Sequence, residues 1–278
     1  MPASERSVEG DDLRLLKDAD LGSLNIVIAF GGWPDAKRVA TRAAEYLKDK
    51  LNAEKIGEID PNALYNFAIQ RPIVRIEQGL MRDYELPRND LYAWKGTRAS
   101  HDLLILIGVE PHISWPRYVE SIFRVVDLEK THRICLLGGL IDRIPHTIEP
   151  LVSGVATTLQ LVEEMKIHGV EPTEYTGPSS IHSFILRESQ RRGIPTMSLW
   201  GHAPEYIVDA DSRTAHQLLS KVKAIMSIDV DLRDLEKEGE MLRRQLDMAM
   251  RENQAFSQLV QRLELDYKVS RRKPDYIK

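Results

Sequence analysis

Short apolar runs that end at glycine alternate with amphipathic segments through residues 24–226, and this alternation restricts the fold more than any other feature. Residues 24–30 are rich in β-branched side chains and stop at Gly31 and Gly32, as a buried strand does. Residues 35–51 then carry apolar side chains near helical spacing, with Asp35 suited to an N-cap. Repetition of this unit predicts an α/β fold, a three-layer α/β/α sandwich around a mainly parallel sheet.

The other elements are expected as follows. Strands are predicted at 102–108, 133–137, 151–156 and 194–200, and helices at 115–130, after 156 through Met165, at 181–191 and at 215–226. Short strands at 72–77, 81–86 and 91–94, separated by polar turns, are typical of an antiparallel meander. The pattern does not determine the strand order.

The distribution of charge divides the chain into a body and a tail. Residues 229–278 hold 11 acidic and 11 basic side chains, so the tail is far richer in charge than the body. We expect a flexible N-terminal segment at 1–20, an α/β/α body at 21–228 and a charged helical tail at 229–278. The helix of this C-terminal extension is predicted to span residues 231–268.

Composition excludes several classes of protein. The single cysteine, Cys135, cannot form an intramolecular disulfide, which excludes a disulfide-built secreted scaffold and a cysteine-rich zinc site. A net charge of −4 gives no reason to expect a nucleic-acid partner. The apolar runs are much shorter than the roughly 18 residues of a membrane-spanning helix, and the polar N-terminus does not resemble a signal peptide. We expect a cytoplasmic protein that binds neither nucleic acid nor membrane.

The ends of the expected parallel strands supply a candidate ligand pocket. Open α/β sheets bind ligands beyond the carboxyl ends of their strands, where small residues let backbone amides approach an anion and acidic or histidine side chains can move protons. A site for a nucleoside, sugar or carboxylate is therefore considered at Gly31, Gly32, Asp35, Glu110, His112, Gly138, Gly139, Gly177, Ser179 and His202. The alternative is that the glycines form tight turns and that Ser179 or Ser180 caps a helix.

The standard catalytic signatures are absent from the sequence. The segment around Ser153 lacks the first glycine of a G-x-S-x-G nucleophile elbow. There is no phosphate loop of the form G-x-x-x-x-G-K-[ST], no G-x-G-x-x-G after the first strand and no H-E-x-x-H. The eight histidines are scattered singly, so a metal site has no support. We expect no cofactor and no metal, and favour a role without catalysis; a phosphorylase/hydrolase-like enzyme is the alternative.

Six short motifs follow one another along the body in a specific order. They are FGGWPDA at 30–36, RP at 71–72, LIGVEP at 106–111, LGGL at 137–140, Y-x-GPS at 175–179 and GIPTMSLW at 193–200. Together they resemble the proteasome assembly chaperone 2 family in its prokaryotic form, over residues 24–235. The resemblance implies a phosphorylase/hydrolase-like α/β/α body followed by a smaller helical part.

The same resemblance implies a non-catalytic, self-associating protein with a chaperone-like role. It suggests a homo-oligomer, for which a trimer or a larger assembly is considered, and proteasome α-type subunits as a candidate partner. Family members that dock on proteasome α-rings end in a hydrophobic–tyrosine–any tripeptide, which directs attention to Tyr276, Ile277 and Lys278. In this chain Tyr276 is third from the end, one place earlier than in that pattern.

From Leu232 to Tyr267, positions that are alternately three and four residues apart are apolar, except at Gly239 and Asn253. This spacing predicts a coiled-coil or helix-packing seam, and its candidate residues are Leu235, Leu242, Leu246, Phe256, Val260 and Leu263. A glycine costs a helix about 1 kcal/mol, so we expect a bend or break near Gly239. Asn253 could set the register of an oligomer. The seam could face another chain or fold back on the body, because periodicity does not separate the two.

Overall fold

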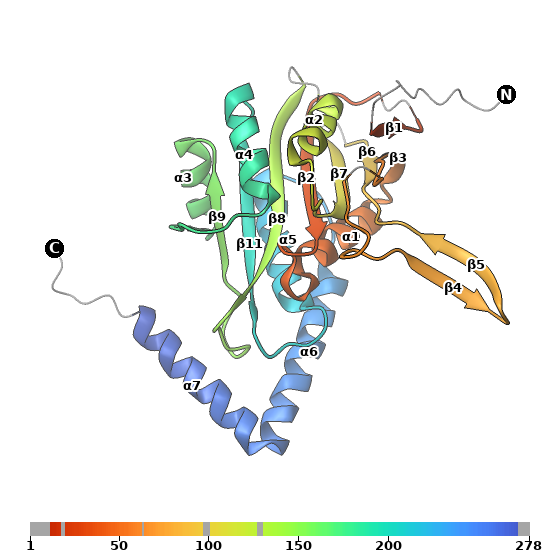
Figure 1. Ribbon diagram of the computed structural model, residues 1–278. Coiled ribbons are helices and arrows are strands. Elements are labelled where there is room, and N and C mark those ends of the chain that lie inside the picture. The colour runs from red at the N-terminus through yellow and green to blue at the C-terminus, as the bar shows by residue number, and fades with distance from the viewer. Residues whose placement is uncertain (1–11, 18–19, 63, 97–100, 127–129, 272–278) are drawn as a thin grey trace.

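The computed structural model describes residues 12–17, 20–62, 64–96, 101–126 and 130–271. Within these residues a nine-stranded sheet forms the centre of the body, and helices cover both faces (Figure 1). The strands lie in the spatial order β1 (Leu13–Leu15), β3 (Glu54–Ile59), β6 (Asp90–Trp94), β7 (Asp102–Val109), β2 (Leu24–Gly31), β8 (Thr131–Asp142), β11 (Thr196–Pro204), β9 (Val152–Ala156) and β10 (Glu171–Pro172).

The middle of the sheet is parallel and its flanks are mixed. Strands β7, β2, β8 and β11 run parallel to one another. Strand β6 is antiparallel to β7 and to β3, β9 is antiparallel to β11, and β10 is parallel to β9. The expected α/β class, with a mostly parallel central sheet flanked by helices, is confirmed.

Alternation along the central strands builds the core on both faces. In β2, Ile26, Ile28 and Phe30 join one buried apolar cluster, whereas Val27 and Ala29 join the other. Successive side chains of a strand point to opposite faces, so a fully apolar strand requires a helical layer on each side. The first cluster packs against α2 (Trp115–Val125) and α4 (Ile181–Arg192), and the second against α1 (Val39–Leu51), α3 (Leu159–Ile167) and α5 (Ser212–Met226).

Two of the three strands expected in the meander leave the body altogether. Strands β4 (Ile73–Glu77) and β5 (Leu80–Glu85) form a separate two-stranded sheet that projects from the body, in orange in Figure 1. Every residue of both strands is exposed. Only β6 joins the central sheet, between β3 and β7. We refer to residues 73–85 as the hairpin arm.

The segment expected to be flexible at 1–20 contains an edge strand. Leu13 is buried, and β1 pairs antiparallel with β3. Backbone pairing with the otherwise free edge of β3 explains why residues 13–15 are ordered. A strand of three residues is too short to be predicted from its sequence. Residues 1–11 and 18–19 lie outside the described part of the chain.

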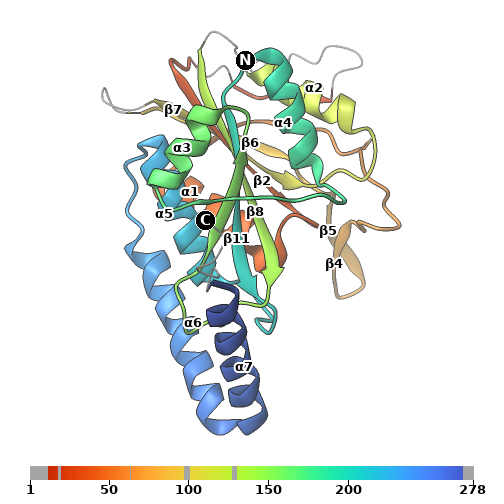
Figure 2. The same cartoon turned by 90° about the vertical axis from the view of Figure 1, so that its left-hand side faces the viewer.

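The tail forms two helices where one was expected. Helix α6 (Arg233–Glu252) and helix α7 (Gln254–Arg271) meet at Asn253, whose backbone is extended at φ −126° and ψ 105°. The side-chain oxygen of Asn253 accepts the N–H of Phe256 at 3.1 Å, so the asparagine caps α7. The helices form a V in Figure 1 and lie along each other in Figure 2. No helix among the described residues is long and apolar enough to cross a membrane.

The expected bend or break near Gly239 does not occur as a break, because α6 continues through this residue. A Cβ at Gly239 would lie 2.9 Å from the Cα of Arg213 in α5. The missing side chain lets α6 approach α5 closely, and this packing offsets the poor helix propensity of glycine.

Candidate functional site

Asp35, predicted both as a helix cap and as a pocket residue, caps α1. Its carboxylate accepts the N–H groups of Ala40 at 2.8 Å and Thr41 at 3.1 Å, together with the Thr41 hydroxyl at 2.5 Å. Burial raises the pKa of Asp35, and the bonds from Thr41 and Ala40 oppose that rise. The side chain is thereby committed to the start of the helix.

Glu110 and His112, which follow β7, hold neighbouring segments of the body in place. Glu110 accepts the N–H of Ile181 at 2.8 Å, at the first residue of α4, and burial raises its pKa. The Nδ1 atom of His112 accepts the N–H of Asn66 at 3.3 Å, and its ring packs edge-on against Tyr65.

Three of the predicted glycines lie where a side chain would collide with a neighbour. A Cβ at Gly138 would lie 2.5 Å from the Trp200 ring, and one at Gly139 would lie 2.8 Å from the carbonyl oxygen of Ala36. A Cβ at Gly177 would lie 2.5 Å from the hydroxyl of Tyr175, in the exposed loop that also holds Ser179. The Trp200 ring therefore occupies the space above Gly138 that a ligand would need.

Gly31, Gly32 and Asp35 are brought together in one open groove of about 530 Å³. Its walls carry charges of both signs, from Arg38, Glu45, Lys48, Arg88 and Asp90. Of the remaining predicted residues, Glu110 lies beside Gly32, at 3.7 Å from a Cβ built there. Ligand binding by the predicted set stays a prediction.

His202 belongs to a polar network that the sequence did not predict. Its Nδ1 lies 2.7 Å from Oδ2 of Asp142, and its Nε2 lies 2.8 Å from Oγ of Ser153. The bond from His202 lowers the pKa of Asp142, which keeps that side chain a carboxylate. Strand β11 lies between β8 and β9, which brings together residues 11 and 60 positions apart. Because the sequence does not determine the strand order, it gives no signal for this network.

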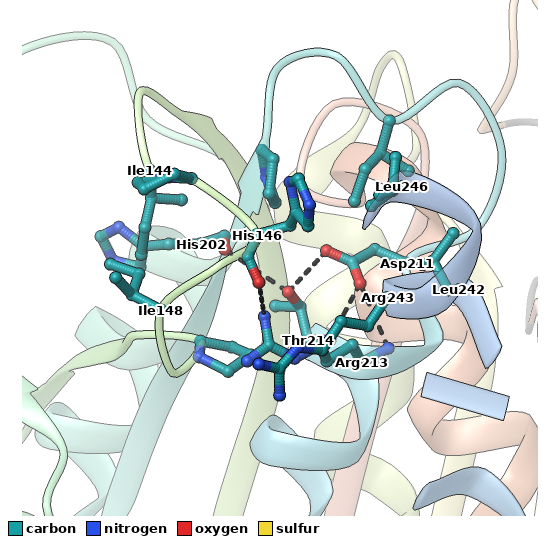
Figure 3. Close-up of a pocket in the computed structure, with 14 residues that line it drawn as sticks. Ile144, His146, Ile148, His202, Asp211, Arg213, Thr214, Leu242, Arg243 and Leu246 are labelled. Atoms are coloured by element: carbon teal, nitrogen blue, oxygen red, sulfur yellow. Dashed lines mark hydrogen bonds between the residues drawn. The ribbon is translucent and has the colours of Figure 1, made fainter. Parts of the chain in front are cut away.

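A small cavity lies where the body meets α6 (Figure 3). Its volume of about 10 Å³ has room for one water molecule and for no larger ligand. Asp211 accepts the N–H groups of Arg213 at 3.1 Å and Thr214 at 3.0 Å, and so caps α5. Arg213 donates to the carbonyl of His146 at 2.5 Å, which ties α5 to the loop after β8.

The same loop, residues 143–151 between β8 and β9, enters the V formed by α6 and α7. His146 lies 3.4 Å from Asp247 of α6, and its ring stacks on Phe256 of α7. Further contacts join the loop to α7: Thr147 donates to Glu264 at 2.5 Å, and Arg143 pairs with Asp266 at 3.0 Å.

The predicted seam residues of the tail are buried or half-buried by contacts within the chain. Leu235, Val260 and Leu263 are buried, and Leu242, Leu246 and Phe256 are half-buried. Leu242 and Leu246 also line the cavity of Figure 3. These contacts are those of the fold-back arrangement, and packing of the seam against another chain stays a prediction. Tyr276, Ile277 and Lys278 lie outside the described residues, and their docking role stays a prediction.

A known protein family matches this chain. The model of the PAC2 family matches residues 29–250, which include most of the body and nearly all of α6. The chain belongs to the PAC2 family. The resemblance carried by the six motifs is therefore confirmed. A search of curated protein sequences finds no match.

Solved structures support the PAC2 assignment. A proteasome-assembly chaperone homologue from Mycobacterium tuberculosis is 27% identical, with a TM-score of 0.77 over 85% of this chain and 99% of its own. A second M. tuberculosis protein, of unknown function, is 21% identical, with a TM-score of 0.85 over 96% of this chain and 92% of its own. PbaB, an archaeal proteasome activator from Pyrococcus furiosus, is 22% identical, with a TM-score of 0.68 over 85% and 97%. The last two support the fold alone.

Proposed function

We propose that this chain is a self-associating assembly factor that acts through protein–protein contact, in the manner of proteasome assembly chaperones. Membership of the PAC2 family and the 27% identity to a proteasome-assembly chaperone homologue support an assembly role. This role requires a surface for another protein and needs neither a cofactor nor a chemical step.

The observation that carries self-association is the hairpin arm. Two strands without a third strand or a helix to cover them are marginally stable in water. The arm nonetheless exposes six large apolar side chains: Ile73, Val74, Ile76, Leu80, Met81 and Tyr84, which are 47–68% exposed. Apolar side chains gathered on one projecting element are typical of a protein-binding surface.

Strand pairing sorts these side chains by face. Val74 lies opposite Tyr84 and Ile76 lies opposite Met81, which gives two apolar pairs. Between them, Arg75 lies opposite Asp83. Alternation along β4 puts Val74 and Ile76 on one face and Arg75 on the other. A register shift between Arg75 and Ile76 leaves Arg82 as an extra residue on β5 and places Met81 opposite Ile76, so the two apolar pairs share one face.

A second copy of this chain is the occupant that we propose for the arm. Its charged residues have both signs: Arg75 and Arg82 against Glu77, Asp83 and Glu85. A surface with charges of both signs does not favour a strongly acidic or a strongly basic partner. It can pair with the same surface on a second copy of the chain, where basic residues meet acidic ones. Contact through the arms would yield the homo-oligomer, a trimer or a larger assembly, that the family resemblance suggests.

Capture of proteasome α-type subunits tests the assembly role. Immobilised full-length protein is mixed with purified α-type subunits, and the bound fraction is quantified. We expect retention of the subunits, and loss of retention when Tyr276, Ile277 and Lys278 are deleted. Unchanged capture by the deletion variant would remove the terminal-tyrosine mechanism, and no capture by the full-length protein would reject these subunits as partners.

The groove at Gly31, Gly32 and Asp35 favours a second candidate function, the binding of a small molecule such as a nucleoside, a sugar or a carboxylate. A ligand held at 100 times its dissociation constant adds about 2.7 kcal/mol to the free energy of unfolding. Thermal unfolding with nucleosides, sugar phosphates and inorganic phosphate measures this effect. A rise in Tm that is lost in Gly32→Val would support the groove, and the absence of a rise with every compound would count against it.

A further inference from the structure

Ser153, His202 and Asp142 have the connectivity of a nucleophilic triad. The hydroxyl of Ser153 is placed to donate to Nε2 of His202 at 2.8 Å, and Nδ1–H of His202 donates to Asp142 at 2.7 Å. In such a triad the carboxylate holds the imidazole in one tautomer and orientation, and the other ring nitrogen accepts the hydroxyl proton. A triad is recognised by this geometry and not by sequence spacing, so the missing nucleophile elbow does not exclude it.

The three residues lie where α/β folds place their reactive groups. Asp142 ends β8 and His202 lies two residues before the end of β11, two parallel strands whose carboxyl ends coincide. Ser153 reaches the same edge because β9 runs antiparallel beside β11 and pairs Ser153 with Trp200.

The face of the sheet beside Ser153 is partly exposed at one position. Val155 lies two residues further along β9, on the same face as Ser153, and is 41% exposed. Ser153 itself is 8% exposed. Ser153 is therefore a buried hydroxyl, and the partly exposed face at Val155 is the side from which an ester would approach it.

A second serine–histidine pair in the same sheet provides a contrast. Ser198 of β11 lies 3.0 Å from Nδ1 of His182, whose Nε2 has no hydrogen-bond partner among the described residues. His182 is buried between the rings of Phe30 and Trp200, and no acid in the described part of the chain orients it. Ser198 is fully buried and lacks a histidine oriented by a carboxylate, which Ser153 has.

We propose that Ser153, His202 and Asp142 form a hydrolytic site for small uncharged acyl esters. Ser153 Oγ bonds to the ester carbonyl carbon while Nε2 of His202 takes the hydroxyl proton. Nε2 then protonates the alcohol oxygen as its bond to that carbon breaks. Water attacks the acyl-serine and passes a proton to Nε2, which returns it to Ser153 Oγ as the carboxylic acid leaves.

The surroundings favour an apolar acyl group. Trp200 lies opposite Ser153 on the same face, and Val155 continues that face along the strand. The carboxylate at the site is already bound to His202, and a second negative charge in the substrate would be repelled by it. The inference is independent of the assembly role, which uses the hairpin arm.

A fluorophosphonate probe tests the site, because it forms a covalent bond with activated serines. The full-length protein is incubated with the probe, and the modified residue is located by peptide mass spectrometry. We expect one label on Ser153, which is absent in Ser153→Ala and retained in the matched control Ser198→Ala. Hydrolysis of 4-nitrophenyl butyrate should be lost in Ser153→Ala and in His202→Gln.

Asp142 is a positioning residue in this scheme, and its variants separate orientation from folding. We expect Asp142→Asn to slow labelling about tenfold or more and Asp142→Glu to restore part of the rate, with unchanged Tm in both. A wild-type protein that takes no label at Ser153 would overturn the proposal, as would equal labelling rates in wild type and Asp142→Asn.

Discussion

The ring of Phe256 stacks on the ring of His146, with 6.2 Å between the centroids and 6° between the planes. One residue belongs to the last helix and the other to the loop between β8 and β9. Tyr206 packs edge-on against both rings. This aromatic cluster joins the tail to the body, and through it the predicted seam residue Phe256 contacts the body of its own chain.

Phe256→Ala should loosen the tail. Phenylalanine-to-alanine changes cost about 3–5 kcal/mol in a full core. Phe256 is half-buried, so we expect a loss of about 1–3 kcal/mol in the free energy of unfolding, with faster amide exchange in α7. Leu259→Ala, at an exposed position of the same helix, should cost about 0.5 kcal/mol or less. Equal losses in the two variants, measured by urea unfolding, would show that the stack does not hold α7.

Gly239→Ala should destabilise the protein although alanine is the better helix former. Propensity favours the change by about 1 kcal/mol. The new methyl group would lie 2.9 Å from the Cα of Arg213, and backbone atoms cannot move aside as a flexible side chain can. We expect a net loss of about 1–3 kcal/mol in the free energy of unfolding. Met241→Ala, exposed on the same helix, serves as the control, and a gain of stability in Gly239→Ala would contradict the close packing of α5 and α6.

Acidification should weaken the fold through His182. Burial lowers the pKa of His182 from 6.5 to about 3. Between these values the unfolded chain binds a proton that the folded chain does not, so stability is complete above pH 6.5 and falls as the pH drops. The slope from this group approaches about 1.4 kcal/mol per pH unit. Comparison with His182→Gln isolates the effect, since buried Asp35 and Asp211 have raised pKa values and act in the opposite direction. Identical slopes in both proteins would contradict a neutral, buried His182.

The sequence predicted the central strands well, and physical reasons explain where it failed. Strands β2 and β7 are continuous apolar runs, which only a doubly covered sheet can bury. Strand β3, with the sequence EKIGEI, lies near the sheet edge and half its residues are charged, so its sequence did not predict a strand. The hairpin arm was recognised as two strands, but alternation does not tell which sheet a strand joins.

The functional predictions depended on strand order, which the sequence does not determine. His202 was selected for its place at a strand end, whereas Asp142 and Ser153 were not, because only the neighbouring positions of β8, β11 and β9 bring them together. In the tail the 3-4 spacing of apolar residues continues across Asn253, so it gave no sign that α6 and α7 are separate helices. The side chain of Asn253 is a good helix cap, and that signal was available.

Self-association through the hairpin arm is the central claim, and the molar mass in solution tests it most directly. Light scattering after size-exclusion chromatography should give a multiple of 31.8 kDa for the full-length protein and 31.8 kDa for Ile76→Glu with Met81→Glu. Ile167→Glu, an exposed apolar residue on α3 far along the chain from the arm, should keep the oligomer and serves as the control. A monomeric wild type, or an arm variant that keeps the wild-type mass, would contradict the account.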